Sequence, residues 1–449
     1  MRRLIFAFVV FFAVSAFAQY TDRDAIAHLG GPQEFARRRA ELQKELKTGW
    51  TLLFARINEP EANNYREDND FYYFTGLQDQ GAVLLMNNQT GDVTIFEPVQ
   101  QPRMKQVYGP NLIGLDEAAR AELGYKKVQP AEDLELALSR ILGQAVPADL
   151  WVRLGFADKV DGARAETALD YGEQYMAPYG DSTPGDRSAL EKLSARYPAV
   201  HLRDLTESID QLRNIKTPGE IEVLRRNGKI SAEGNRRAIA RAKPGMYQYQ
   251  VAAEARYWYA MNGAQGIAYP AIVGSGPTAN TWHYFQDRDK INAGEVVVFD
   301  FAADLDHQAM DITRTFAIDG KFTHEQAKWY AADLASQKAT IALLKPGHTY
   351  EEAAAAGKKV FDDNGVGDQW YGYPGHFVGM ATHDVGRVSG PIKAGQVVTV
   401  EPIIEIFDKH WHFRVEDTIL ITDGEPEILS SGVPKEIGDI EKLVGSEAK

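Results

Sequence analysis

Five residues in the second half of the chain are of types that could together hold two metal ions. They are four carboxylates and one imidazole: Asp300, Asp311, His376, Glu401 and Glu416. An oxygen-rich set of this kind suits hard or borderline divalent ions. Two such ions side by side can activate a water molecule and polarise a carbonyl group. Each residue alone would more often be a solvated strand end or a structural histidine, so the hypothesis depends on the set.

The elements around the two aspartates predict how they come together. Residues 296–299 form an apolar, β-branched and aromatic run, which is typical of a buried strand. Asp300 at its end is carried toward the interior, where a carboxylate needs a cation or hydrogen bonds. A second strand starts near Asp311 in the segment DITRTFAI. If the two strands pair, the two carboxylates lie side by side.

A third strand is predicted from the alternation that begins at Phe413. Side chains two residues apart share a face of a strand, so Arg414 lies on the face of Glu416. Arg414 could therefore neutralise and orient a carboxylate of the site. His412 shares this face too. It could line the cleft, or it could be an exposed histidine without a function.

The sequence segments around the five residues resemble those of a known protein family. Asp300 ends EVVVFD, Asp311 opens DITRTF, His376 lies in PGHFVGMATHDVG, Glu401 ends VVTVE, and Glu416 lies in FRVEDTILIT. In this order, with this spacing of the aspartates, they resemble the metallopeptidase family of aminopeptidase P, prolidase and methionine aminopeptidase. The resemblance implies a C-terminal domain of the pita-bread fold, within an α/β (α+β) chain.

The resemblance also implies roles for the five residues. Asp311 and Glu416 would bridge both metals, Asp300 would complete the shell of one, and His376 and Glu401 that of the other. A water or hydroxide between the metals would be the nucleophile. Glu401 is expected to carry a proton from that water toward the departing nitrogen. Mn²⁺ is the expected metal, and Co²⁺ or Zn²⁺ would fit the same ligands.

Two further histidines match the substrate positions of the family. His283 lies in Thr-Trp-His-Tyr before Asp300, and His383 lies in Thr-His-Asp-Val-Gly after His376. The resemblance implies that both contact the substrate at the scissile bond. A hydrogen-bond donor is needed there because charge develops on the carbonyl oxygen.

The chain departs from the family pattern at two places. Gly372 stands where many members carry another histidine. In the family, Pro-Gly usually follows the metal glutamate, whereas Pro402 and Ile403 follow Glu401 here. Both changes lie in loops on the substrate side. They put the specificity in doubt more than the binding of metal.

The N-terminus predicts export. Arg2 and Arg3 precede an apolar run, and Ala-Phe-Ala at positions 16–18 is typical of a cleavage site, so residues 1–18 are interpreted as a signal peptide. The run is short for a transmembrane span, although an uncleaved anchor is the alternative. We therefore expect a periplasmic or secreted protein without stable membrane insertion after cleavage. The chain has no cysteine, so cysteine usage does not indicate a redox compartment.

Length indicates the number of domains, and net charge narrows the kinds of partner that the protein could bind. The 449 residues exceed what one core usually serves, and the formal net charge of −14 argues against nucleic-acid binding. We expect an N-terminal domain at 19–205 and a pita-bread metallopeptidase domain at 206–449. A linker is predicted near 184–203. Thr217, Pro218 and Glu220 form a capping box, which predicts a helix that runs toward Ala242.

The N-terminal domain contains its own family marker. Residues 65–76 read YREDNDFYYFTG, which resembles a segment of the N-terminal domain of aminopeptidase P and is expected to form an aromatic core strand. Strands are also predicted at 81–86 and 92–96, joined by a polar turn. The resemblance thus implies a creatinase/aminopeptidase-P-type N-terminal α/β domain.

These features predict a metal-dependent peptidase that removes a residue preceding proline, acting on proline-containing peptides. The imide bond calls for a dedicated site, because the proline nitrogen cannot donate a hydrogen bond. Prolidase, which cleaves Xaa-Pro dipeptides, is the alternative. Methionine aminopeptidase is disfavoured by the extra domain, and creatinase by the intact ligand set. A non-catalytic pita-bread binding module is the alternative of another class, and the resemblance leaves a homodimer or homotetramer open.

Overall fold

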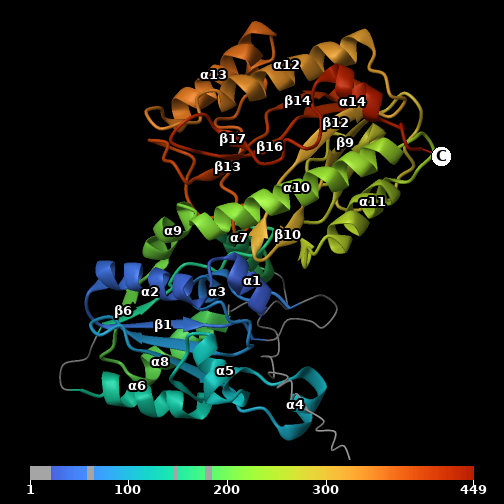
Figure 1. Ribbon diagram of the computed structural model, residues 1–449. Coiled ribbons are helices and arrows are strands. Elements are labelled where there is room, and N and C mark those ends of the chain that lie inside the picture. Colours follow the sequence, from blue (N-terminus) through green and yellow to red (C-terminus); the bar gives the residue numbers. More distant parts are fainter. Residues whose placement is uncertain (1–21, 58–64, 145–148, 177–184, 449) are drawn as a thin grey trace, which may run out of the picture.

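The computed structural model describes residues 22–57, 65–144, 149–176 and 185–448 (Figure 1). The predicted signal peptide, 1–18, lies outside these residues. Within them, no helix is both long and apolar enough to cross a membrane. The described chain forms an N-terminal part built on one large sheet and a C-terminal part in which two pairs of helices enclose the strands.

The N-terminal sheet has six strands in the order β4-β3-β2-β1-β5-β6. They are β1 (Trp50–Phe54), β2 (Val83–Asn87), β3 (Val93–Glu97), β4 (Val128–Pro130), β5 (Asp149–Val152) and β6 (His201–Asp204). Strands β2 and β3 form the predicted antiparallel hairpin, and they start two residues and one residue later than predicted. The helices around the sheet are α1 (Arg23–His28), α2 (Pro32–Leu46), α3 (Asn69–Thr75), α4 (Pro102–Tyr108), α5 (Glu117–Glu122), α6 (Leu134–Leu142), α7 (Arg164–Met176) and α8 (Gly185–Arg196).

The aromatic segment was predicted as a strand, and this prediction is wrong. Residues Asn69–Thr75 form helix α3, and every residue of the helix is buried. Asp68 accepts hydrogen bonds from the first backbone N–H groups, and Gly76 ends the helix in the left-handed conformation with φ of 67°. Because all faces of this helix are covered, the sequence shows no helical period in its polar residues.

The predicted linker near 184–203 is also wrong. Helix α8 occupies much of it, and β6 follows as an edge strand that pairs in parallel with β5. Leu190 and Leu193 of α8 are buried against the sheet. The two parts instead meet where β6 ends and α9 (Thr206–Asn214) begins.

The C-terminal part begins with two long helices. Helix α10 (Pro218–Arg241) has the predicted capping box, in which the Thr217 hydroxyl accepts from the Glu220 N–H and the Glu220 carboxylate from the Thr217 N–H. It pairs with α11 (Gln248–Met261), and α12 (His324–Ile341) pairs with α13 (Tyr350–Asp363). Figure 1 shows the C-terminal strands between these two helix pairs. The short α14 (Ile437–Leu443) lies near the chain end.

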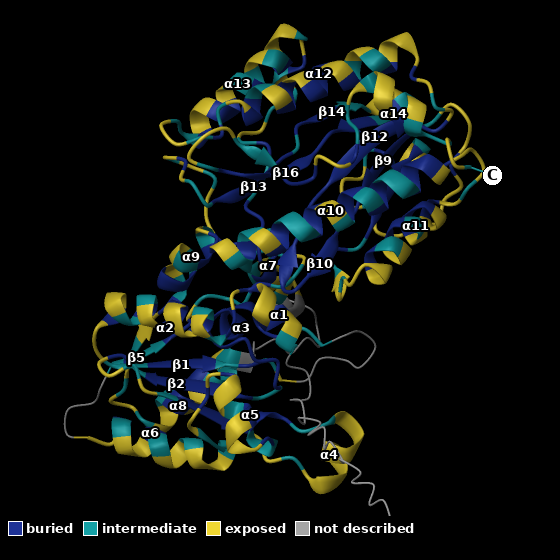
Figure 2. Ribbon diagram, in the orientation of Figure 1, coloured by how far each residue is buried: buried dark blue, intermediate teal, exposed yellow. Residues whose placement is uncertain are grey.

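The strands between the helix pairs form several small antiparallel sheets, in the orders β12-β9-β8, β13-β16-β17, β14-β15 and β11-β10-β7. Their bounds are β7 (Gly266–Ile267), β8 (Ile272–Ser275), β9 (Val296–Asp300), β10 (Ala303–Leu305), β11 (Gln308–Ala309), β12 (Thr313–Ala317), β13 (Val397–Val400), β14 (Ile403–Ile406), β15 (Trp411–Arg414), β16 (Asp417–Leu420) and β17 (Glu427–Ile428). Figure 2 shows β9, β12, β13 and β16 buried, while the outer faces of α12 and α13 are exposed.

The two parts share a core. The apolar cluster around α2 and α3 includes Val223 of α10, Leu305 of β10 and Met380 from a C-terminal loop. Burial of apolar surface is the main favourable term in folding and association. The N-terminal part is therefore packed against the C-terminal strands, and side chains of the two parts can contribute to one site.

Candidate metal centre

Strand pairing brings the two predicted aspartates together. Strands β9 and β12 run antiparallel with Asp300 opposite Thr313, and Asp311 lies two residues before Thr313. The Tyr269 hydroxyl joins the two carboxylates, at 2.5 Å from Asp300 Oδ1 and 2.6 Å from Asp311 Oδ1. One phenol has a single proton to donate, so it cannot satisfy two ionised carboxylates at the same time.

A loop beside β13 positions His376. Its backbone N–H donates to the Thr399 hydroxyl at 3.0 Å, and its carbonyl accepts from the Thr399 N–H at 2.8 Å. Gly375 makes this approach with φ of 151°, and a Cβ there would lie 2.4 Å from the Thr399 carbonyl oxygen. The ring nitrogen Nε2 then lies 3.3 Å from Glu401 Oε1 and 3.5 Å from Asp311 Oδ2.

The two glutamates complete the cluster. Glu401 follows β13, and its N–H donates to the Pro374 carbonyl at 2.9 Å. Glu416 lies between β15 and β16, where its Oε2 accepts from the Thr313 hydroxyl at 2.7 Å. Its other oxygen, Oε1, is buried without a hydrogen-bond partner. Ligand atoms of Asp311, His376 and Glu416 all lie within 4.8 Å of one another.

The electrostatics of the cluster fit a cation site. Burial raises the pKa of Asp300 to about 7 and, with neighbouring carboxylates, raises the pKa of Glu416 well above its usual value. Burial opposes ionisation of His376, but its hydrogen bonds to Asp311 and Glu401 hold its pKa well above the usual value. Four carboxylates with the unpaired buried oxygen of Glu416 are what divalent ions bind.

Arg414 ends β15, and the strand predicted from Phe413 onward is interrupted at Val415 and Glu416 before β16 begins at Asp417. Nη2 of Arg414 donates to Asp300 Oδ2 at 2.7 Å, and the Arg414 side chain is 3% exposed. The guanidinium thereby neutralises part of the negative charge and fixes one oxygen of Asp300. A contact of this kind can orient a metal-binding carboxylate, and the orienting role of Arg414 stays a prediction.

The two substrate-side histidines lie at the edge of the cluster. The His383 ring is centred 4.1 Å from the His376 ring and tilted by 57°. His283 is exposed, with its ring stacked on Phe285 at 5.6 Å. Partial burial, then the neighbouring side chains of Arg414 and His383, lower the pKa of His283.

His412 differs from the exposed residue that the sequence suggested. It is 1% exposed, its Nδ1 lies 3.4 Å from Glu405 Oε1, and its ring meets Trp282 edge-on. Burial and the nearby Arg414 charge lower its pKa to about 4, against the hydrogen bond with Glu405. His412 is thus a buried neutral side chain behind the Trp282 loop.

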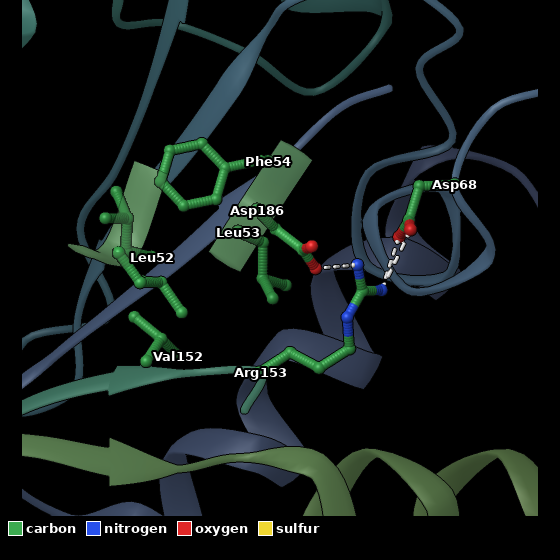
Figure 3. Close-up of a pocket in the computed structure, with 8 residues that line it drawn as sticks. Leu52, Leu53, Phe54, Asp68, Val152, Arg153 and Asp186 are labelled. Atoms are coloured by element: carbon green, nitrogen blue, oxygen red, sulfur yellow. Dashed lines mark hydrogen bonds and ion pairs between the residues drawn. The ribbon is translucent and has the colours of Figure 1, made fainter. Parts of the chain in front are cut away.

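A pocket in the N-terminal part lies apart from this cluster (Figure 3). Apolar side chains of β1 and β5 line it, including Leu52 and Val152. Its charged groups satisfy one another, since Arg153 donates to Asp68 at 2.8 Å and to Asp186 at 2.7 Å. It offers no unpaired charge for a reaction.

Three residues at the site were missed by sequence reasoning. Thr313 could have been found, because it shares the strand face of Asp311 two residues away. Tyr269 lies in a loop before β8, and Glu166 belongs to α7 of the N-terminal part, where its Oε1 accepts from His383 Nδ1 at 2.6 Å. No local pattern connects either of them with the ligands.

The chain matches two family descriptions. Residues 222–423 match metallopeptidase family M24, and residues 35–150 match the aminopeptidase P N-terminal domain. The matches cover the part that carries the five predicted ligand residues and the part built on the large sheet. Both halves of the predicted fold, the pita-bread domain and its N-terminal α/β domain, are thereby confirmed.

Relatives that match over nearly their whole length support the same family. An Xaa-Pro aminopeptidase from Escherichia coli is 30% identical, over 92% of this chain and 97% of the relative. One from Haemophilus influenzae is 28% identical over the same shares. An Xaa-Pro dipeptidase from Pyrococcus furiosus is 32% identical, but over 53% of this chain and 68% of its own length.

Solved structures show the same arrangement of both parts. Aminopeptidase P from E. coli with the inhibitor Pro-Leu has a TM-score of 0.77 and 26% identity, over 93% of this chain and 99% of that one. A Zn-substituted form of the E. coli enzyme in complex with product gives the same TM-score at 27% identity, over the same shares. The chain therefore belongs to the aminopeptidase P family of pita-bread metallopeptidases.

Proposed function

We propose that this protein is a metal-dependent exopeptidase that releases the N-terminal residue from peptides with proline in the second position. The observation that carries the proposal is the cluster of four carboxylates and His376, with the His383 ring against that of His376, in a chain that matches Xaa-Pro aminopeptidases along nearly their whole length. The intact ligand set disfavours a non-catalytic binding module.

The ligands would be Asp300, Asp311, His376, Glu401 and Glu416, and we propose two divalent ions, with Mn²⁺ as the metal. When bound, such ions polarise a carbonyl group and lower the pKa of water. Arg414 and Tyr269 would hold Asp300 and Asp311 in place, by the hydrogen bonds described above.

The protein's own groups would then handle the protons and the developing charge. Glu401 would take a proton from the attacking water and deliver it to the departing nitrogen. His283 and His383 would hydrogen-bond to the reacting carbonyl, where negative charge develops in the transition state. The proline nitrogen has no hydrogen to donate, so recognition must come from shape and from the carbonyl.

We also propose that the protein is exported, because residues 1–18 have the composition of a signal peptide. Peptides in the periplasm or outside the cell would then be its substrates. A fusion of residues 1–18 to a reporter, compared with an Arg2, Arg3 double substitution, tests export directly.

The function is tested with three peptides after chelation and addition of Mn²⁺: Xaa-Pro-Yaa, Xaa-Pro and Xaa-Ala-Yaa. We expect hydrolysis of the first, slower hydrolysis of the dipeptide and almost none of the alanine peptide. Preference for the dipeptide would make the protein a prolidase, and equal cleavage of the alanine peptide would contradict the proline specificity.

A further inference from the structure

A carboxylate of the N-terminal part reaches the metal centre. Oε1 of Glu166, in the first turn of α7, accepts a hydrogen bond of 2.6 Å from Nδ1 of His383, 217 residues further along the chain. The His383 ring in turn lies 4.1 Å from that of the proposed ligand His376. A side chain outside the metallopeptidase domain therefore sits directly behind a substrate-side histidine.

The Glu166 side chain is fixed from its own helix as well. Its Oε2 accepts a hydrogen bond of 2.7 Å from the backbone N–H of Ala163, the residue before α7. A glutamate at the third helical position is well placed for this contact, and the positive end of the helix favours its charged form. Helix capping explains the hydrogen bond of Oε2 but not the hydrogen bond between Oε1 and His383.

Both neighbours of His383 are held as well, Thr382 by the N-terminal part and Asp384 by residues in and just after α9. The N–H of Thr382 donates to the Val160 carbonyl at 2.7 Å, three residues before Ala163. Asp384 is ion-paired with Arg213 and Lys216, each at 2.6 Å. With its two neighbours held, the remaining freedom of His383 is rotation of its ring, and Glu166 acts on that rotation.

The contact also decides which ring nitrogen faces the substrate. A carboxylate can only accept, so Nδ1 must carry the hydrogen of this bond. Burial alone would raise the pKa of Glu166, but the hydrogen bond from His383 holds it below the usual value, so the carboxylate is ionised. The other nitrogen, Nε2, lies on the far side of the ring from Glu166.

We propose that Glu166 is the positioning residue of His383, fixing its ring with Nδ1 protonated and Nε2 presented to the peptide, so that the N-terminal domain completes the active site. This inference rests on the proposed function for the role of His383. The pair contributes little to the free energy of unfolding, because the two side chains are 43% and 26% exposed. We therefore expect the Glu166–His383 contact to affect kcat and not the stability of the fold.

The first experiment measures kcat and KM on an Xaa-Pro-Yaa peptide for Glu166→Ala and Glu166→Gln. We expect kcat to fall about 10- to 100-fold in Glu166→Ala with bound Mn²⁺ and Tm nearly unchanged, as for other residues that orient a catalytic group. Glu166→Gln should lose less, since its amide oxygen can accept from Nδ1. Glu173→Ala, an exposed glutamate of the same helix, is the matched control and should match wild type.

A double-mutant cycle separates positioning from docking of the domains. If Glu166 acts through His383, adding Glu166→Ala to His383→Ala should lower kcat no further. Wild-type kcat in Glu166→Ala, or an additive loss in the double variant, would overturn the inference.

A readout independent of peptide cleavage keeps the inference testable if the proposed function fails. In protein labelled with ¹⁵N-histidine, the signal absent from His383→Ala identifies His383. We expect Nδ1 to carry its hydrogen in wild type and to lose that preference in Glu166→Ala. A wild-type His383 whose Nδ1 carries no hydrogen would contradict the inference, whereas the absence of Xaa-Pro hydrolysis by wild type would contradict only the proposed function.

Discussion

At the scale of single residues, the site gathers carboxylates whose ionisation burial opposes: the pKa values of Asp300 and Glu416 are both raised. Asp300, Asp311 and Glu416 are nearly inaccessible, and the guanidinium of Arg414 is the fixed cation hydrogen-bonded to one of them. Gathering several buried carboxylates costs free energy unless cations stabilise their charged forms. A bound divalent ion would favour ionised Asp300 and Glu416 and so offset this cost.

His383 should affect the chemistry and leave metal binding intact. Its Nδ1 is directed to Glu166, and the residue is not one of the five proposed ligands. We expect His383→Ala to lower kcat on Xaa-Pro-Yaa about 10²- to 10³-fold, the usual effect of losing a donor to a developing oxyanion. His348→Ala, a partly exposed histidine paired with Glu352, is the control and should turn over normally. Loss of bound metal in His383→Ala would contradict this role.

The proposed ligand residues could be predicted because their order and flanking segments resemble a known family. Strand burial predicted that Asp300 is carried toward the interior, whereas alternation placed Arg414 only on the face of Glu416 and did not predict its contact with Asp300. Tyr269 and Glu166 could not be predicted, since their contacts depend on how loops and helices pack in three dimensions. A hydrogen bond across 217 residues leaves no periodic signal in the sequence.

At the scale of elements, the wrong predictions have a common cause. Helix α3 was taken for a strand because all of its side chains are buried. Its polar residues therefore repeat neither every two positions, as in a strand with one exposed face, nor every 3.6 positions, as in a helix with one exposed face. Its capping signals, Asp68 before it and Gly76 after it, were present in the sequence. The segment 184–203 was taken for a linker from its Pro, Gly and charged residues, although Leu190 and Leu193 of α8 bury against the sheet.

The hairpin of the N-terminal sheet carries a second pair of buried carboxylates. Burial raises the pKa of Asp79 to about 6, and burial with the nearby Asp79 raises the pKa of Glu97 well above its usual value. Glu97 Oε2 accepts a hydrogen bond from the Ile113 N–H, and Asp79 Oδ2 accepts one from the Leu112 N–H. The second oxygen of each carboxyl group receives neither of these hydrogen bonds. In the folded state the pair therefore holds a proton that the unfolded chain releases.

This pair should make stability fall as pH rises. A raised folded-state pKa contributes stability that is full below the unfolded value, near 4.5 for Glu97, and is lost as pH rises through the folded value. The shift of Asp79 from 3.8 to about 6 alone corresponds to on the order of 3 kcal/mol. We expect Glu97→Gln, which keeps a donor toward Asp79, to flatten the decline of unfolding free energy above pH 5.

Urea unfolding at several pH values checks this prediction. The exposed Glu117→Gln is the matched control and should follow wild type. A wild-type free energy of unfolding that rises between pH 5 and pH 8 relative to Glu97→Gln would contradict the prediction.

At the scale of the whole molecule, one buried ion-pair network joins the two parts. Arg213, after the N-terminal sheet, pairs with Asp70 of α3 at 2.7 Å, with Asp158 at 2.6 Å and with Asp384 of the catalytic loop at 2.6 Å. All four side chains are at most 1% exposed. The network links the position of His383, the neighbour of Asp384, to the folding of the N-terminal part.

Breaking this network should destabilise the molecule. Arg213→Met leaves three buried carboxylates without their shared cation, and we expect a loss of about 3–5 kcal/mol in unfolding free energy. Chemical denaturation of Arg213→Met measures it, with Arg236→Met, in a half-buried helix pair with Glu233, as the control expected to lose under about 1 kcal/mol. Similar losses in both variants would mean that the network does not hold the two parts together.

The most direct test of the central claim is titration of the chelated protein with Mn²⁺, with hydrolysis of Xaa-Pro-Yaa followed in parallel, for wild type, Asp311→Ala and Glu416→Ala. We expect wild type to bind two ions per chain and to gain activity as they bind. Each variant should bind metal poorly and remain inactive, because each lost carboxylate is proposed to serve both ions. Normal turnover in either variant, or wild-type activity without bound metal, would contradict the account.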